Sequence, residues 1–286
     1  MEDLFKDWLF RYSIMFRFRY TDKQKKKFLN AFVHDISLIR DDIKVIEYKT
    51  NKKYNSRNIY VGNIKSADYI ICAYYDTPPA HFGDYILFNR EKQGKQTMKA
   101  VLFASIIWIL LGILVTFVYI NSFLSKIELI SFTNLFVVIF YLIYFLVLAR
   151  LSKGYFNFNN LIRNTSSILL MLKLIKENKS NRVAYAFYDE GSYGEKGFEV
   201  IKRATKKNAK FIFLDCIGAD ASLNVVGNLF KNKIKGVMYY PSKDEHNYIF
   251  CGERNEEFYL DKEKLNEKEI NYTQFNKTIE ILKEIM

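Results

Sequence analysis

Two long apolar runs stand out in a chain that elsewhere alternates between short apolar and charged segments. No charged residue occurs over 100–125 or over 129–149. A helix needs about 20 apolar residues to cross the hydrocarbon of a bilayer. The pattern therefore predicts membrane spans over 101–120 and 129–149, joined by the short link 121–128 as a helical hairpin. A hairpin buried inside a soluble protein is the alternative interpretation.

Basic residues gather at the two outer ends of the predicted hairpin and are nearly absent from the link between its spans. The basic residues before the first span are Arg90, Lys92, Lys95 and Lys99. Arg150 and Lys153 follow the second span, and Lys126 is the only basic residue of the link. The positive-inside rule then places both ends of the chain in the cytoplasm. We expect Lys99, Trp108 and Arg150 to contact the membrane. Neither span carries a charge, so nothing indicates an ion path.

The first 40 residues predict two helices. Over 1–20, aromatic and aliphatic residues recur at helical spacing beside arginines, which is typical of an amphipathic helix that lies on lipid or packs against its own domain. Over 21–40, Thr21 and Gln24 form a capping-box pattern ahead of an apolar stripe. No signal peptide is expected, because acidic residues precede any apolar core.

The rest of the chain alternates between apolar strand-like runs and amphipathic helical runs, which predicts an α/β sheet with mostly parallel strands. The expected strands are 44–49, 58–64, 69–75, 182–188, 211–214, 222–226 and 236–240. The expected helices are 161–176, 195–207 and 272–286.

Composition narrows the possible partners. Lys and Arg outnumber Asp and Glu by 43 to 31, for a net charge of +12. With membrane spans predicted and no nucleic-acid-binding motif, this charge favours an anionic inner leaflet over nucleic acid. Three well-separated cysteines predict neither a disulfide framework nor a structural zinc site. The richness in Lys, Asn, Ile, Tyr and Phe is typical of an AT-rich bacterial genome.

Acidic residues follow three of the predicted strands. They are Asp76, the pair Asp189 and Glu190, and Asp215. Ligands of α/β sheets bind beyond the carboxyl ends of the strands, and carboxylates gathered there can hold a metal ion and supply a general base. The alternative is that these residues cap the helices that follow the strands.

The same residues resemble the di-zinc aminopeptidase superfamily, which includes glutamate carboxypeptidase, glutaminyl cyclase and transferrin receptor. The resemblance rests on Tyr74-Tyr75-Asp76, on Arg163-Asn-Thr-Ser opening a helix, on Asp189-Glu190-Gly191, and on Asp215 in its strand-end context. It covers roughly 22–285 apart from the hairpin. It implies a three-layer α/β/α sandwich with a mixed, mostly parallel sheet, divided as an amphipathic helix (1–20), two parts of a peptidase-like domain (21–98 and 151–286) and an inserted hairpin (99–150).

The resemblance also implies roles for single residues. Asp189 matches the catalytic base and Asp76 the residue that supports a ligand, while Glu190 and Asp215 match two zinc ligands. The family's first His ligand is replaced by Tyr74, and its bridging Asp by Arg163. An arginine at that position would repel divalent cations, so we expect Arg163 to occlude the site by pairing with Glu190 or Asp215. Tyr74 is expected to occlude the site as well. No cofactor is expected, and zinc only if the chain is an active enzyme.

Three functions remain open. The first is a catalytically inactive, membrane-anchored subunit that binds a peptide or a membrane partner, such as an ABC-type transporter in a bacterial peptide export or processing complex. The chain has no GxxxxGK[ST] motif, so the ATPase would be another chain. The second is an active membrane-bound metallo-aminopeptidase with an unusual metal site, and the third is a stand-alone adaptor or immunity protein. All three predict a two-pass protein of a bacterial cell membrane.

Overall fold

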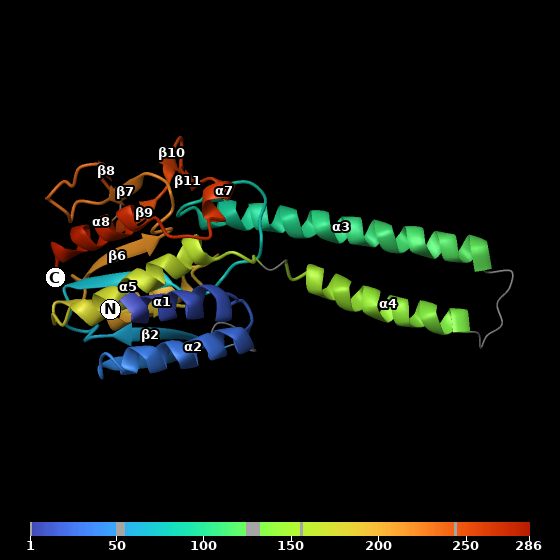
Figure 1. The fold of residues 1–286 in the computed structure, drawn as a ribbon, viewed down its shortest axis with the longest axis horizontal. Coiled ribbons are helices and arrows are strands. Elements are labelled where there is room, and N and C mark those ends of the chain that lie inside the picture. The colour runs from blue at the N-terminus through green and yellow to red at the C-terminus, as the bar shows by residue number, and fades with distance from the viewer. Residues whose placement is uncertain (1, 50–54, 124–131, 155–156, 243–244) are drawn as a thin grey trace. The chain divides into compact units, whose positions relative to one another are not determined.

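The computed structural model describes residues 2–49, 55–123, 132–154, 157–242 and 245–286 (Figure 1). By its internal contacts the chain divides into two units. The body consists of Met1–Pro78, Gly83–Glu91 and Asn157–Met286, and the helical unit consists of Pro79–Phe82 and Lys92–Phe156. Most of the predicted link and the start of the second predicted span, 124–131, lie outside the described residues.

The body is built on an eight-stranded sheet of order β1-β2-β5-β3-β6-β9-β7-β8. Its central strands β5, β3, β6 and β9 are parallel, and antiparallel pairs join β1 to β2, β2 to β5 and β7 to β9. A second, three-stranded sheet has the order β10-β11-β4. The strands are β1 (Ile43–Lys49), β2 (Asn55–Val61), β3 (Tyr69–Tyr74), β4 (Tyr85–Ile86), β5 (Val183–Tyr188), β6 (Lys210–Asp215), β7 (Leu223–Val226), β8 (Val237–Tyr240), β9 (Asn247–Cys251), β10 (Glu253–Arg254) and β11 (Phe258–Leu260).

Helices cover both faces of the large sheet. They are α1 (Glu2–Phe10), η1 (Arg11–Met15), α2 (Asp22–Ser37), η3 (Leu161–Thr165), α5 (Ser166–Glu177), α6 (Lys196–Ala204), α7 (Lys262–Leu265) and α8 (Tyr272–Lys283) in the body. Two more helices, α3 (Arg90–Phe123) and α4 (Phe132–Leu151), account for most of the helical unit.

The alternation of side chains along the strands divides the core into two layers. In β3, Ile71 and Ala73 belong to the larger core, which contains α1, α2, α5 and α8, whereas Ile70 and Cys72 belong to the smaller core beneath α6. Removing each large apolar side chain from water contributes roughly 1.5–3 kcal/mol, so the larger core supplies most of the hydrophobic stabilisation. The predicted three-layer α/β/α class with a mostly parallel sheet is confirmed.

Local signals set several element boundaries. Thr21 and Gln24 form the predicted capping box at the start of α2. Strand β2 ends earlier than predicted, because Gly62 has a φ of +90° and turns the chain after Val61. Ile64, which the prediction placed in that strand, instead lies in the smaller core.

The amphipathic N-terminal segment packs its inner face against the body. Trp8 and Tyr12 are buried in the larger core, where Tyr12 contacts the rings of Phe28 and Phe32 edge-on. The Tyr12 hydroxyl also donates to the Asp35 carboxylate. Packing against its own domain therefore accounts for Trp8 and Tyr12, whereas Phe10 is 53% exposed, and contact of the outer face with lipid stays a prediction.

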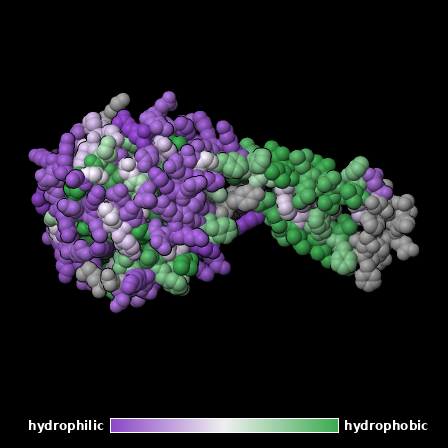
Figure 2. Space-filling view, turned by 45° about the horizontal axis from the view of Figure 1, so that its top comes forward, coloured by the Kyte–Doolittle hydropathy of each residue, from purple (hydrophilic) through white to green (hydrophobic). Residues whose placement is uncertain are grey.

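One helix of the helical unit is long and apolar enough to cross a membrane. It is the segment Arg90–Asn121 of α3, and only 11% of its most apolar stretch is buried. Hydrophobic residues cover the surface of α3 and α4 (Figure 2). The described apolar part of α4, Leu135–Leu151, is shorter, so the second crossing stays a prediction.

A seam of paired polar groups joins α3 to α4. Trp108 stacks on Tyr144 with ring centroids 5.7 Å apart, and each side chain donates to the other residue's backbone carbonyl, at 3.2 and 3.1 Å. Gly112 leaves room for this contact, since a Cβ there would lie 2.3 Å from the Tyr144 hydroxyl. Trp108 thus contacts α4, and membrane contact by Lys99, Trp108 and Arg150 stays a prediction.

Candidate functional site

A cavity of about 110 Å³ opens in the body at the carboxyl ends of β3, β5 and β6. A water molecule takes up about 30 Å³ in the liquid, so the cavity holds a few waters or one amino-acid side chain. It is lined by Tyr74, Phe88, Arg90, Tyr188, Gly194, Glu195, Phe198, Phe213, Leu214, Asp215, His246 and Tyr248. These strands are parallel neighbours, which is why their carboxyl ends meet at one place.

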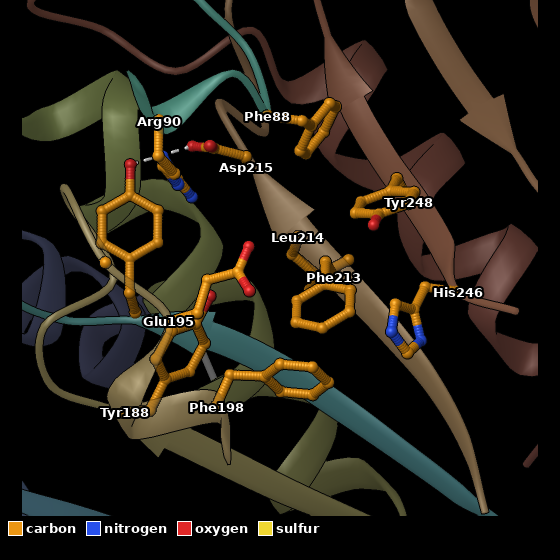
Figure 3. A pocket seen from close by; sticks show the side chains of 12 residues that line it. Phe88, Arg90, Tyr188, Glu195, Phe198, Phe213, Leu214, Asp215, His246 and Tyr248 are labelled. Atoms are coloured by element: carbon orange, nitrogen blue, oxygen red, sulfur yellow. Dashed lines mark hydrogen bonds between the residues drawn. The ribbon is translucent and has the colours of Figure 1, made fainter. Parts of the chain in front are cut away.

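Aromatic rings form one part of the cavity (Figure 3). Phe198, on α6, meets Phe213 of β6 edge-on at 4.8 Å between centroids, and Tyr248 stacks on Phe213 at 5.3 Å. His246 lies edge-on to both phenylalanines, at 5.3 and 5.6 Å. Such a surface suits an apolar or aromatic group of a ligand.

Asp215 lies at the opposite end of the cavity from His246 (Figure 3) and is held by two tyrosines. The Tyr74 hydroxyl donates to Oδ1 at 3.2 Å, and the Tyr85 hydroxyl donates to Oδ2 at 2.7 Å. Burial raises the pKa of the Asp215 carboxyl above its usual range, although Arg90 and the Tyr85 hydroxyl oppose that shift. Burial and the nearby carboxylate raise the pKa of Tyr85 to about 12, so its hydroxyl remains a donor at neutral pH.

Two arginines complete this end of the site. Arg90 Nη1 donates to the Tyr85 hydroxyl at 3.0 Å, and its guanidinium lies 5.0 Å from the centroid of the Tyr74 ring. Arg163 Nε donates to the Tyr74 hydroxyl at 3.1 Å, and its guanidinium lies 4.2 Å from the centroid of the Tyr85 ring. Arg163 is fully buried, and its Nη1 and Nη2 atoms have no hydrogen-bond partner among the described residues.

The predicted pairing of Arg163 is wrong in its detail. We expected a direct contact with Glu190 or Asp215, but the guanidinium reaches Asp215 only through the Tyr74 hydroxyl. Within the described part of the chain, Arg163 forms no salt bridge. The reason is that two tyrosines lie between the groups: the Tyr74 hydroxyl accepts from Arg163 Nε and donates to Asp215, and the Tyr85 ring lies beneath the guanidinium.

Asp189, the predicted base, does not line the cavity. It is buried and pairs with Lys25 of α2, with 2.5 Å between Nζ and Oδ1, and its backbone N–H donates to Asn58. Burial and the nearby Asp76 carboxylate raise the pKa of Asp189 to about 6, while the Lys25 ammonium opposes the shift. The side chain therefore ties α2 to the end of β5.

Asp76 and Glu190 also bond to the protein outside the cavity lining. The Asp76 carboxylate accepts from the backbone N–H groups of Gly191 and Ser192, at 2.9 and 3.2 Å, and so fixes the loop after β5. Glu190 accepts from the Ser56 hydroxyl at 3.0 Å. The four predicted acidic residues are thus split between loop contacts and the cavity, where only Asp215 lies.

Several residues that line the cavity, and Tyr85, which holds Asp215 from behind the lining, were not predicted. Tyr85 and Arg90 lie in a segment without clear periodicity, and Arg90 was counted among the basic residues that precede the membrane span. Glu195 opens α6, and His246 comes just before β9, a strand that the sequence did not predict. An isolated polar residue beside an apolar run carries no signal of its own, so these positions follow only from the tertiary fold.

The side chains around Asp215 do not fit a zinc ion as they are arranged. Structural and catalytic zinc sites use three or four protein ligands, and the described residues contain no group of three or more His, Cys, Asp or Glu side chains placed to hold a metal ion. Both Asp215 oxygens already accept hydrogen bonds, from Tyr74, Tyr85 and the Cys216 thiol, and a metal ion would have to compete with these donors. We therefore derive no chemical step through a metal.

No protein-family model matches the chain, and no curated protein matches it in sequence. Solved structures do match. Glutaminyl cyclase of Porphyromonas gingivalis aligns at 11% identity and a TM-score of 0.53, over 100% of this chain and 99% of that one. Glutaminyl cyclase of Bacteroides thetaiotaomicron, solved with N-acetylhistamine, aligns at 10% identity and 0.51, over 97% and 94%. A protein of Bacteroides vulgatus described as a zinc-dependent exopeptidase aligns at 11% and 0.41, over 79% and 64%.

The chain therefore has the α/β fold of the di-zinc aminopeptidase-like superfamily, which confirms the resemblance at the level of the fold. Within that class it is similar to the two bacterial glutaminyl cyclases over almost their whole length. It spans only about two thirds of other matched structures, 64% of the exopeptidase and 65% of a further glutaminyl cyclase.

The comparisons also correct one expectation. From the sequence we expected no cofactor, and for a protein of this fold that expectation is wrong, because the fold shared with the two glutaminyl cyclases is that of the di-zinc aminopeptidase-like superfamily.

Proposed function

We propose that the chain is a membrane-anchored, peptidase-like subunit whose cavity binds one end of a peptide without hydrolysing it. The observation that carries this proposal is the state of Asp215. Of the four acidic residues predicted for the site, it is the one that lies in the cavity, where the resemblance assigned it as a zinc ligand, and both of its oxygens accept hydrogen bonds from tyrosines.

A hydrolytic site needs a general base within hydrogen-bond reach of the attacking water. Asp189, which matches the base of the family, is bound to Lys25 and lies outside the cavity lining, and Glu195 and His246, which do line the cavity, do not occupy the position of that base. Burial raises the pKa of Tyr74 and Tyr85, so neither hydroxyl serves as a base near pH 7. The aromatic walls and the small volume instead favour binding of a single residue of a peptide.

The membrane part of the proposal rests on α3 and on the flanking charges. Arg90–Asn121 is long and apolar enough to cross a bilayer, and α4 would return the chain. The basic residues at Lys99 and Arg150 would then lie at the anionic inner leaflet, with both termini in the cytoplasm. A membrane partner such as a subunit of an ABC-type transporter would place the cavity in a peptide export complex.

Peptide binding and hydrolysis are measured on the same detergent-purified protein. Defined tripeptides are equilibrated with the protein by dialysis, and bound and cleaved species are quantified by mass spectrometry, with and without added zinc. We expect saturable binding, loss of affinity in Phe198→Ala, and no cleavage. The exposed Tyr272→Ala, on α8, is the matched aromatic control. Cleavage would overturn the proposal and support an active membrane metallo-aminopeptidase.

Topology is tested with two exposed positions at opposite ends of the helical unit. Single cysteines at Asn121→Cys and Ser152→Cys are probed in intact cells with a thiol reagent that does not cross membranes. We expect labelling at position 121 only, and labelling of both or neither would contradict the two-pass arrangement. Stoichiometric co-purification of transporter subunits would support the export complex, whereas their absence would favour a stand-alone adaptor or immunity protein.

A further inference from the structure

We infer that the cavity selects a ligand carboxylate, and in particular the C-terminal carboxylate of a peptide, over a ligand ammonium group. This inference rests on the proposed function, since it names the end of the peptide that the cavity takes.

The charges at the Asp215 end of the cavity do not balance. Two guanidinium groups, Arg90 and Arg163, surround a single carboxylate, Asp215, and the two tyrosines between them are neutral. Arg163 is completely buried, with two of its three nitrogens lacking a hydrogen-bond partner among the described residues. A buried charge without full compensation is costly, so a second negative charge is stabilised here.

The carboxylate of Glu195 does not cancel the excess positive charge at this end of the cavity. Glu195 also lines the cavity, but its side chain is exposed, and water screens an exposed charge far more than a buried one. Asp215 is a poor partner for an ammonium group, because its carboxylate is buried and already accepts hydrogen bonds from Tyr74, Tyr85 and the Cys216 thiol. An incoming cation would also be repelled by the guanidinium of Arg90, which lines the cavity.

Arg90 is the residue placed to contact the carboxylate. It lines the cavity and donates one hydrogen bond, to Tyr85, within the described part of the body. A guanidinium has five N–H donors in a planar fork that matches a carboxylate, so donors remain for a ligand. Arg163 does not line the cavity, and it acts on the site through Tyr74 and Tyr85.

The aromatic end of the cavity fits the side chain of the same terminal residue. Phe198, Phe213 and Tyr248 form an apolar surface, and about 110 Å³ accommodates one aliphatic side chain. The geometry thus points to a peptide that ends in an apolar residue with a free carboxylate.

Four peptides of one length test the inference with wild-type protein. They are acetyl-Ala-Ala-Leu with a free C-terminal acid, the same peptide as the amide, Ala-Ala-Leu-amide with a free N-terminus, and acetyl-Ala-Ala-Glu-amide, whose only carboxylate is on a side chain. A hydrogen bond to a charged group contributes about 1.5–3 kcal/mol, so we expect the acid to bind about ten- to a hundredfold more tightly than its amide.

Arg90→Gln should abolish this preference, and Arg90→Lys should keep part of it. Arg254→Gln is the matched control, because Arg254 also lies over a tyrosine ring, Tyr240, at 4.7 Å, but on the second sheet of the body. Circular dichroism checks that each variant is folded. Since the peptide comparison is made with wild-type protein, it remains decisive if Arg90→Gln fails to fold.

Each outcome has a distinct meaning. Equal binding of the acid and its amide would overturn the inference and leave peptide binding in place, and preference for the peptide with the free ammonium would also overturn it. Binding of the glutamate peptide as tightly as the leucine acid would support selection of a carboxylate and overturn its assignment to the C-terminus of the peptide. Binding of none of the four would overturn both the inference and the proposed function.

Discussion

Asp189 and Asp215 follow or end the two strands that flank β3, and both are 2% exposed, yet their charges are compensated in different ways. Asp189 contacts an ammonium directly, with Lys25 Nζ 2.5 Å from Oδ1. Asp215 contacts two neutral hydroxyls, and the guanidinium groups lie one step further away.

This difference separates a structural contact from a binding surface. A direct ion pair satisfies both charges and joins two elements, here α2 and the end of β5. Asp215 accepts hydrogen bonds from neutral hydroxyls, so its negative charge does not fully balance the positive charges of the nearby guanidinium groups. Arg90, which lines the cavity, is therefore available to a ligand. Residues that look equivalent in the sequence, an aspartate after a buried strand, thus serve different purposes because of what packs against them.

The largest expected effect tests the buried ion pair between Lys25 and Asp189. Lys25→Met leaves Asp189 buried without a cation, and removing one partner of a buried pair costs about 3–5 kcal/mol. We expect that loss in the free energy of unfolding, measured by denaturant titration in detergent with fluorescence of the buried Trp8.

A neighbouring lysine provides the control. Lys26, on the same helix, pairs with Asp22 at 2.9 Å, but both side chains are largely exposed. Lys26→Met should cost at most about 1 kcal/mol. Adding Asp189→Asn to Lys25→Met should recover part of the loss, because it removes the unpaired charge. Equal effects of the two lysine variants would contradict the structural role of Lys25.

The second prediction concerns pH and the same carboxylate. The pKa of Asp189 rises from 3.8 to about 6 in the folded protein, so the folded state holds this proton more tightly than the unfolded state. The resulting stabilisation is fully present below about pH 4 and is lost as the pH rises through 6. At about 1.4 kcal/mol per pKa unit it amounts to about 3 kcal/mol.

The measurement compares wild type with Asp189→Asn from pH 4 to pH 7.5. Because the amide does not titrate, the stability of the wild type relative to the variant should fall across this range. Lys25→Met should move the inflection upward, since the ammonium favours the charged carboxylate. An inflection below pH 4 would show that the ion pair outweighs burial and would contradict the raised pKa of Asp189.

The sequence predicts the fold well where local patterns are strong. The run 182–188, predicted as a strand, forms β5 over Val183–Tyr188, and the capping box of Thr21 starts α2 as expected. Strand β9 was missed because Asn247–Cys251 is a short run with a polar start, and its pairing with β6 and β7 is a long-range contact. Local propensity carries no information about such pairing.

The site was only partly predictable for the same reason. Asp215 follows from its place at a strand end, but its partners Tyr74 and Tyr85 are 141 and 130 residues away in the chain. Arg90 belongs at once to the start of a long apolar helix and to the cavity. Its basic side chain was interpreted as a membrane flank, since nothing in the sequence distinguishes the two.

The smallest expected effect tests the hydrogen bonds of Tyr85 to Asp215 and Arg90. Tyr85→Phe removes the donor to Asp215 Oδ2 and the acceptor of Arg90 Nη1 while keeping the ring beneath Arg163. Leaving a buried polar group unsatisfied costs about 1–3 kcal/mol, less than the loss expected for Lys25→Met. The exposed Tyr272→Phe should have almost no effect in the same unfolding assay. If Tyr85→Phe were as destabilising as Lys25→Met, the Tyr85 hydroxyl would serve mainly to stabilise the fold. A smaller loss combined with weaker carboxylate binding would instead show that Tyr85 holds Arg90 in position for a ligand.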